Sequence, residues 1–368
     1  MKKIKIGFLG LGYMGQLAHL LHYVQLPELC EIVALCDVKI EQAKKLANRY
    51  DIPKVYANHR DFLADKDVEA VVCIQQFENH ISLVPEILQA GKHLITEKPL
   101  CVFPQNGEKL AQAAKDSGKI HMVGYHKRSD PAIEHARGLV SQWKESGEMG
   151  KMTYVRLSMP PGDYRKDPDT PYFTSEPPGQ VSPEPSPTGI SEEQRHRMVW
   201  FVNYYIHQVN LMRHLLGEDY QLTHAQKHLF TGISESGVNC LLELESYTTT
   251  VDWQEHALVC FEKGWIRVDL TAPLASQLAS TVTVYQDKGL TGSAYSYPTM
   301  PNVCAMRNQA RNFLLTVAGE RNAPCISEEA VKDLRIAEDY IRLTSQLNDP
   351  KTPYHLRNEK FDTLDEPF

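Results

Sequence analysis

The first third of the chain alternates short apolar runs with segments of helical periodicity. Apolar runs typical of buried strands lie at residues 4–9, 31–36, 70–74, 93–96 and 120–124, with a shorter one around Val55. Helical spacing fills the gaps between them, at 16–24, 41–50, 81–90 and 107–117, with a further helical turn from residue 61. Strand and helix signals that alternate in this way are typical of βαβ units. We therefore predict a doubly wound α/β domain with a parallel sheet over residues 1–125.

The pattern changes after residue 125. One helix is predicted at 131–145, a half-buried strand at 152–158 and a long helix at 195–216. Residues 160–187 hold nine of the chain's 22 prolines, so this stretch is predicted to be a long loop. Further strands are expected at 228–231, 238–247, 249–253, 257–261, 265–270 and 281–285, followed by helices at 308–317 and 328–347. We predict a second, α+β domain over 126–368, with a large, mostly antiparallel, open sheet.

Composition narrows the class of protein without changing this picture. Hydrophobic residues make up 42% and charged residues 23% of the chain, as in an ordinary globular protein, and the net charge of −7 argues against nucleic-acid binding. No apolar stretch approaches the roughly 18 residues that a membrane helix needs. The eight cysteines are scattered and form no CxxC pair, which predicts free thiols, no metal site and a reducing, cytoplasmic compartment.

A glycine motif follows the first predicted strand. Gly10, Gly12 and Gly15 form a GxGxxG where a strand ends and a helix begins, the setting in which this motif binds a dinucleotide. The first glycine permits the tight turn, the second lets the pyrophosphate approach the backbone, and the third lets helix and strand pack closely. We predict a Rossmann domain in which Tyr13 and Met14 also contact the cofactor.

An acidic residue ends the second predicted strand. Asp37 lies 22 residues after Gly15, near the spacing expected for the carboxylate that binds the ribose hydroxyls. Its charge would repel a 2′-phosphate, which favours NAD as the cofactor. Lys39 and Lys44 lie close by in sequence and keep NADP open as an alternative.

The strand at 93–96 runs directly into Glu97, Lys98 and Pro99. In open α/β sheets, ligands bind at the carboxyl ends of the strands, so Lys98 is expected at the nicotinamide crevice with Glu97 beside it. The ammonium can donate to a substrate hydroxyl and stabilise the alkoxide as hydride leaves, and burial would lower the pKa of Lys98 toward proton exchange. The Lys98–Pro99 bond is a candidate for the cis isomer.

Four stretches together resemble the glucose–fructose oxidoreductase/inositol dehydrogenase (Gfo/Idh/MocA) family over nearly the whole chain. They are GFLGLGYMG at 7–15, EKP at 97–99, GYHKR at 124–128 and the helix that carries His207. The resemblance implies that the glycine turn and Asp37 hold NAD(P) and that Lys98 is catalytic. It also implies that His207 is an acid/base, in a helix motif that in the family usually reads Asp-x-Gly-x-His-x-x-Asp.

The helix motif departs from this pattern at both acids, because Asn203 and Asn210 stand where the family has aspartate. On one continuous helix Asn203 and His207 would share a face, and so would His207 and Asn210. An asparagine can orient substrate hydroxyls but cannot accept a proton. His207 would therefore have to handle the proton without a neighbouring carboxylate.

Two other departures concern the cofactor side of the cleft. Ile74, Gln75 and Gln76 stand where the family often has a Thr-Pro pair, and we expect them to line the nicotinamide side, with His80 in the next helix. His126 replaces a frequent asparagine and is expected near the nicotinamide or the substrate. There it would be a second acid/base, or else a solvated histidine at a strand end.

Aromatic and hydrogen-bonding residues gather on the expected substrate side. At helical spacing such aromatics are equally typical of a core. Arg128 or Arg165 could bind an anionic group of the substrate. The aromatic candidates for the walls of a sugar or cyclitol site are Tyr164, Tyr172, Phe173, Trp200, Tyr204 and Tyr205.

These observations predict an NAD-dependent oxidoreductase that transfers hydride between nicotinamide and a hydroxyl or keto carbon of a sugar, sugar derivative or cyclitol. Lys98 and His207 would handle the hydroxyl proton. Two alternatives stay open: a redox-neutral NAD-dependent glycosidase or lyase that works through a transient keto-sugar, and a non-catalytic NAD-bound sensor. The free face of the open sheet predicts assembly into a homodimer or homotetramer.

Overall fold

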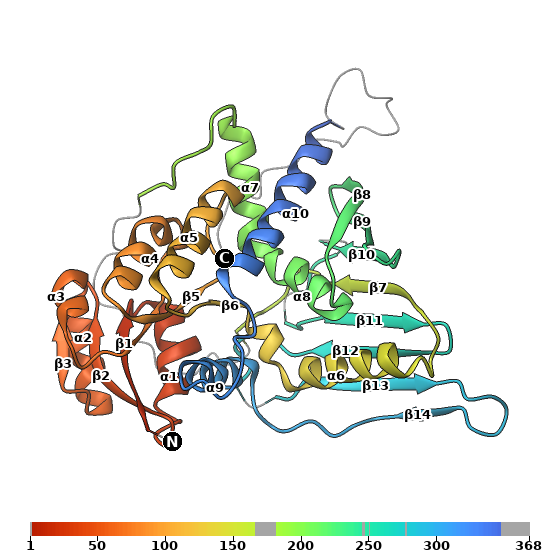
Figure 1. Cartoon of the computed structure of the whole chain (residues 1–368), viewed down its shortest axis with the longest axis horizontal. Helices are drawn as coiled ribbons and strands as arrows, with labels where there is room; N and C mark the ends of the chain where they lie inside the picture. The colour runs from red at the N-terminus through yellow and green to blue at the C-terminus, as the bar shows by residue number, and fades with distance from the viewer. Residues whose placement is uncertain (1, 166–181, 245–246, 250, 277, 347–368) are drawn as a thin grey trace.

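The computed structural model describes residues 2–165, 182–244, 247–249, 251–276 and 278–346. Two sheets with their helices build the fold, and helix α10 (Ser327–Gln346) lies between them (Figure 1). The middle of the predicted proline-rich loop, with Tyr172 and Phe173, lies outside the described residues. None of the helices in the described part is long and apolar enough to cross a membrane.

The N-terminal sheet is parallel and six-stranded, in the order β3-β2-β1-β4-β5-β6. The strand order reverses between β1 and β4, and dinucleotides bind in the crevice at the strand ends beside such a reversal. The strands predicted in this half are confirmed to within one residue at either end, and the short one around Val55 is β3. Their bounds are β1 (Ile4–Leu9), β2 (Cys30–Cys36), β3 (Lys54–Tyr56), β4 (Ala70–Cys73), β5 (His93–Glu97) and β6 (His121–Gly124).

Helices cover both faces of this sheet because side chains alternate along each strand. Ile6 and Phe8 of β1 pack with α1 and with α9 (Ala305–Val317), which returns from the far end of the chain. Val71 of β4 points to the opposite face and packs with α4 and α5. The other helices of this half are η1 (Gly15–Leu20), α1 (Leu21–Tyr23), α2 (Ile40–Tyr50), α3 (His59–Ala64), η2 (Phe77–Asn79), α4 (His80–Gln89) and α5 (Pro104–Ser117).

The second sheet has eight strands in the order β14-β13-β12-β11-β7-β10-β9-β8. Every neighbouring pair is antiparallel except β7 with β10, so the predicted open, mostly antiparallel sheet is confirmed. The strands are β7 (Met152–Ser158), β8 (Tyr220–Gln226), β9 (Leu229–Ser234), β10 (Asn239–Glu243), β11 (Glu255–Phe261), β12 (Gly264–Leu270), β13 (Thr281–Gln286) and β14 (Ala294–Ser296).

The two faces of the second sheet differ in burial. Along β11, Val259 and Phe261 are buried, and Phe261 packs edge-on against Trp143 of α6 (Pro131–Ser146), with ring centroids 5.2 Å apart. Leu258 and Cys260 alternate with them and stay partly exposed on the opposite face. The sheet therefore keeps one face partly open to solvent, as predicted.

The described end of the proline-rich segment lies on the N-terminal half. Glu184 is buried, and its carboxylate accepts hydrogen bonds from the backbone N–H of Val102 at 2.7 Å and of Phe103 at 3.2 Å. The side chain of Asn106 donates a third bond at 2.7 Å. The carboxylate thus caps the start of α5, where backbone N–H groups lack helical partners.

Elements of the second half differ from the prediction. The strands β8 and β14 have no predicted counterpart, because most of their positions are exposed and carry little apolar alternation. The described residues of the predicted strand at 249–253 form no strand; Thr249 instead hydrogen-bonds to the carbonyl of Pro161. The single helix predicted at 195–216 is two helices, α7 (Glu192–Tyr204) and α8 (Ile206–Leu216), with a break at Tyr205.

Candidate active site

The candidate site lies where four neighbouring parallel strands end. The glycine turn follows β1, Ile74 follows β4, Lys98 follows β5 and His126 begins the short helix η3 (His126–Ser129) after β6. Parallel strands end at the same edge, and β1 and β5 are two strand spacings, about 10 Å, apart. The predicted cofactor and substrate contacts among these four segments therefore share one edge of the sheet.

The glycine turn is pressed against the end of β4. Gly10 has a φ of +101°, and a Cβ there would lie 2.1 Å from the carbonyl oxygen of Ile74, so another residue would strain the turn and collide with β4. A Cβ on Gly15 would lie 2.4 Å from the carbonyl oxygen of Gly10. Gly12 is different, because no protein atom lies within 4 Å of its Cβ position. Gly12 borders open space, as a residue beside a bound pyrophosphate must.

Asp37 is fixed beside this turn by two backbone donors. Its Oδ2 accepts from the N–H of Leu11 at 2.6 Å, and its Oδ1 accepts from the N–H of Lys39 at 2.8 Å. The helix that begins at Gly15 has no side-chain cap and no acid in its first turn, so no acidic side chain there competes with an anion for the helix N-terminus. The residues present therefore fit a dinucleotide, with its ribose toward Asp37 and its pyrophosphate toward Gly12.

Glu97 links the glycine turn to the strand that carries Lys98. His19, in η1, donates from Nε2 to the Glu97 carboxylate at 2.6 Å, and both side chains are buried. The backbone N–H of Lys98 donates to the other carboxylate oxygen at 3.1 Å. Burial acts to raise the pKa of Glu97, but the bond and charge of His19, with Lys98, lower it overall. Glu97 is thus an ionised structural anchor.

Lys98 is half-buried at the end of β5, and the Lys98–Pro99 bond is cis. Its Nζ donates to the backbone carbonyl of Asn203 at 2.6 Å. Burial lowers the pKa of Lys98 to about 8; the carboxylate of Glu97 opposes this shift, and the cation of Lys127 adds to it. The pKa of Lys98 therefore lies nearer to neutral pH than that of an ordinary lysine.

The helix break explains why the Asn203 carbonyl is available to Lys98. In a continuous helix this oxygen would accept from the N–H of His207, four residues on. The chain leaves helical geometry at Tyr205, where φ is −107° and ψ is −2°, and Asn203 falls in the last turn of α7. The prediction that Asn203 and His207 share one helix face is wrong for this reason. The Asn203 side chain is exposed, whereas His207 is buried in α8.

His126 and His207 lie against each other. Their ring centroids are 4.4 Å apart at an interplanar angle of 77°. The Nδ1 atom of each ring is buried and has no hydrogen-bond partner among the described residues. Burial lowers the pKa of both rings well below the usual value, and the neighbouring charges of Lys98 and Lys127 lower it further. Two neutral imidazoles therefore stand beside a lysine of lowered pKa.

The remaining cofactor candidates lie at the same edge with different exposure. Gln75 is half-buried and Gln76 is exposed, just after β4. His80 is fully buried; its Nδ1 donates to the carbonyl of Leu100 at 3.0 Å, and burial lowers its pKa to about 4. Through this hydrogen bond, His80 holds the loop that follows Lys98. Tyr13 and Met14 are both half-buried within the glycine turn.

The substrate candidates are more dispersed. Tyr204 is half-buried at the end of α7, with its ring 6.0 Å from that of Trp200. Tyr164 is half-buried near Leu274, whose N–H donates to its carbonyl at 3.1 Å. Arg165 is exposed and pairs with Asp163 at 3.6 Å. The described contacts connect neither Tyr164 nor Arg165 to Lys98 or the two histidines.

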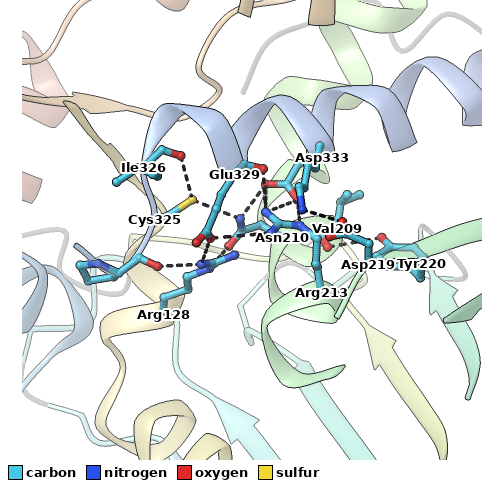
Figure 2. A network of polar contacts seen from close by, with 12 residues as sticks. Arg128, Val209, Asn210, Arg213, Asp219, Tyr220, Cys325, Ile326, Glu329 and Asp333 are labelled. Atoms are coloured by element: carbon cyan, nitrogen blue, oxygen red, sulfur yellow. Dashed lines mark hydrogen bonds and ion pairs between the residues drawn. The ribbon is translucent and has the colours of Figure 1, made fainter. Parts of the chain in front are cut away.

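Arg128 does not point toward the two histidines. Its side chain is 5% exposed, and it bonds to Glu329 at 2.5 Å and to the side-chain oxygen of Asn210 at 2.7 Å. Both partners belong to a network between η3, α8 and α10, in which Asn210 is buried and Glu329 is half-exposed (Figure 2). The guanidinium is committed to protein partners, so the structure does not bring Arg128 into a substrate-binding position.

Two residues near the site have no counterpart among the predicted positions. Lys127 and Glu255 form a buried ion pair at 2.5 Å, with side chains 4% and 1% exposed. Lys127 follows His126 in the same motif and could have been suspected from it. Glu255 begins β11, far away in sequence, and only the sheet brings it to η3.

The sheet order, the glycine turn and Asp37 define a dinucleotide-binding oxidoreductase fold. Residues 4–125 match the family model described as an oxidoreductase family with an NAD-binding Rossmann fold. This model is that of the Gfo/Idh/MocA oxidoreductases, so the match confirms the predicted resemblance over the N-terminal part of the chain, which is an NAD-binding Rossmann fold.

Relatives with named activities cover much of the chain. The inositol 2-dehydrogenase of Salmonella typhimurium is 25% identical over 292 residues, which is 75% of this chain and 77% of that protein. The levoglucosan dehydrogenase of Pseudarthrobacter phenanthrenivorans is 27% identical over 183 residues, covering 46% of this chain and 44% of that protein. The structure of an aldose–aldose oxidoreductase from Caulobacter crescentus shares the fold, with a TM-score of 0.70, 20% identity and coverage of 94% and 98% of the two chains.

The substitution Gly12→Ala should weaken NAD binding without disturbing the fold. The added methyl meets no protein atom within 4 Å but enters the space predicted for the pyrophosphate. We expect a Kd for NAD raised at least about tenfold by calorimetry, with an unchanged melting temperature. Gly138→Ala is the matched control, because its Cβ also meets no atom within 4 Å but lies in α6. Equal NAD affinity in the two variants would contradict the cofactor site.

Proposed function

We propose that the protein is an NAD-dependent dehydrogenase or reductase that acts on a hydroxyl or keto carbon of a sugar, sugar derivative or cyclitol. The observation that carries the proposal is Lys98, whose pKa is about 8, at the same sheet edge as the glycine turn and near the neutral His207. The names of the inositol and levoglucosan dehydrogenases support this class of substrate.

The residues of this chain would manage the hydroxyl proton. A bound nicotinamide would accept or supply the hydride. During oxidation the neutral amine of Lys98 takes the proton from the substrate hydroxyl, and during reduction the ammonium returns it. The substrate hydroxyl then replaces the Asn203 carbonyl as the partner of Lys98 Nζ. His207, uncharged and buried, would hold a neighbouring substrate oxygen by a hydrogen bond and help to pass the proton on.

We infer a preference for NAD over NADP. Asp37 presents a carboxylate held by the N–H groups of Leu11 and Lys39, which suits ribose hydroxyls and repels a 2′-phosphate. The ammonium of Lys44 pairs with Glu41 at 2.8 Å, so this nearby cation already has an acidic partner. Both observations support NAD as the physiological cofactor.

A redox-neutral glycosidase or lyase is the second candidate, and the pair His126 and His207 favours it. After transient oxidation of a sugar hydroxyl, the C–H bond beside the new carbonyl becomes acidic, and its removal needs a further base. The second imidazole, 4.4 Å from the first between ring centroids, could supply that base.

The two candidates differ in what accumulates. We expect that incubating the enzyme with NAD and a panel of sugars, glycosides and cyclitols produces NADH, seen by its absorbance, in equal amount with a keto product. Release of an aglycone without net NADH would favour the glycosidase or lyase. Binding of NAD with turnover of no member of the panel would contradict both and favour a sensor. Repeating the assay with NADP tests the cofactor preference.

The lowered pKa of Lys98 predicts the pH dependence of oxidation. Lys98 must be uncharged to take a proton, so kcat for oxidation should rise with pH and level off above about 8, while kcat for reduction falls there. Lys98→Met should abolish this rise of kcat with pH and lower kcat by about 10²–10⁴-fold. Lys109→Met, on the partly exposed side of α5, is the control and should behave as wild type. Wild-type turnover in Lys98→Met would rule out the proton role.

We further propose that residues 1–125 form the cofactor domain and 126–368 the substrate domain, which joins copies of this chain into a homodimer or homotetramer through its open sheet face. The partly exposed rings of Trp265, Tyr285 and Tyr295 cluster on this sheet. Apolar patches of this kind are typical of protein interfaces. A hollow on this sheet face is lined by Arg156, His256, Leu258, Cys260, Trp265 and Arg267.

All eight cysteines are free thiols, which supports a cytoplasmic location.

A charge placed on this face should break the assembly. Leu258→Asp is expected to shift the mass measured by light scattering from a multiple of 41.8 kDa to the mass of one chain. Leu290→Asp is the control, because Leu290 is fully exposed outside the hollow. A wild-type protein that is monomeric at micromolar concentration would contradict the proposed assembly.

A further inference from the structure

The residues that follow the two histidines in sequence are bound to each other through buried carboxylates. Lys127 and Arg128 follow His126 in η3, while Gln208 and Asn210 follow His207 in α8. The pairing joins η3 to α8 at two places. Each junction is centred on an acid from another element.

The first junction is centred on Glu255 of β11. Its Oε2 accepts from Lys127 Nζ at 2.5 Å, and its Oε1 accepts from Gln208 Nε2 at 2.7 Å. The indole N–H of Trp253 donates a third bond to Oε2 at 3.1 Å. The Glu255 side chain is 1% exposed, so these bonds are not shared with bulk water. One carboxylate thus ties the residue after His126 to the residue after His207.

The second junction is centred on Asp333 of α10 (Figure 2). Asp333 accepts from Asn210 Nδ2 at 2.6 Å and from Arg213 at 3.0 and 3.1 Å, a two-pronged ion pair. Asn210 in turn accepts from Arg128 Nε at 2.7 Å. Arg128 reaches α10 a second time, through Glu329. Asn210 is therefore a link between the guanidinium of Arg128 and the carboxylate of Asp333.

This arrangement requires an amide at position 210. The side-chain nitrogen donates to Asp333 while the side-chain oxygen accepts from Arg128, so both ends of the group are used. An aspartate there could accept from Arg128 but would set a second carboxylate oxygen against Asp333 within the present 2.6 Å contact. Asn210 and Asp333 are therefore matched to each other. An exchange of the two residue types would restore the bond between them and the single negative charge, but the amide nitrogen at position 333 would then face Arg213, which now donates to the same carboxylate oxygen at 3.1 Å.

We propose that Glu255 and Asp333 are positioning residues that set His126 against His207. The inference rests on the proposed function, because it gives the two histidines their part in proton handling. Neither carboxylate touches a histidine. Each one instead binds side chains that follow His126 in η3 or His207 in α8 by one to three residues. Misplacing reacting groups by about 1 Å costs on the order of 100-fold in rate, so the two junctions are expected to appear in kcat.

The test is an exchange of residue types between α8 and α10. Asn210→Asp and Asp333→Asn should each lower kcat by about 10–100-fold, with little change in the Kd for NAD. The double variant should recover part of the lost kcat, because it restores one carboxylate and one amide, while the amide at position 333 keeps only one of the two bonds with Arg213. Glu255→Gln should also lower kcat, since it leaves the Lys127 cation without its anion.

A second measurement does not depend on turnover. The ring signals of His126 and His207 are labelled with ¹³C and assigned through His126→Gln and His207→Gln. They should shift in both single exchange variants and move back toward their wild-type positions in the double variant. Rings this close strongly affect each other's chemical shifts. If wild type turns over no substrate, the proposed function fails, yet these signals still test the positioning.

Asp339→Asn is the matched control. It makes the same change on the same helix, but Asp339 is 41% exposed and pairs only with Arg342 in the described contacts. It should leave kcat and both ring signals unchanged. Ring signals at wild-type positions in Asp333→Asn and Glu255→Gln would overturn the proposal, as would a double variant no better than the worse single variant although it remains folded by circular dichroism.

Discussion

The contact between Lys98 Nζ and the carbonyl of Asn203 joins the strand edge of the first sheet to the helices of the second half. It places a cation in a half-buried position beside a neutral oxygen, while the carboxylate of Glu97 is held by His19. Burial without a dedicated anion is what brings the pKa of Lys98 to about 8. The contact also needs the helix break at Tyr205, which frees the carbonyl. The position of Lys98 at the end of β5, its lowered pKa and the helix break at Tyr205 thus depend on one another.

The two halves of the chain share a core as well as this contact. Phe313 of α9 is fully buried with β1 residues of the first sheet, and Leu334 of α10 packs on α5 through the position of Gly107. The C-terminal helices therefore complete the N-terminal sheet. Because α10 lies between the sheets, its acids reach both α8 and η3: Asp333 bonds to Asn210 of α8, and Glu329 bonds to Arg128 of η3. In the proposed arrangement, the packing of α10 between the sheets therefore also sets the geometry around His126 and His207.

The sequence predicts most of the cofactor side, because its signals are local. A GxGxxG between a strand and a helix, and an acid after the next strand, depend on neighbours in the chain. The proton-handling side depends on contacts between distant elements. The periodicity of 195–216 does not reveal the break at Tyr205, and Glu255 carries no local mark. Asp333, by contrast, has a local signal in the sequence. It lies among the buried residues Ala330, Leu334 and Ala337 of one helix face, where a single acid indicates a buried partner.

The two asparagines that replace the aspartates of the motif, Asn203 in α7 and Asn210 in α8, change how the handling of the proton can be divided. At position 210 the amide serves as a structural link, and at position 203 the backbone carbonyl, not the side chain, contacts Lys98. No carboxylate in the described contacts touches His207, so nothing offsets the burial that keeps this ring neutral near pH 7. A neutral ring of low basicity can orient a hydroxyl but holds a proton poorly. In the proposed reaction, Lys98 is then the group that stores the proton, and the histidine pair passes and directs it.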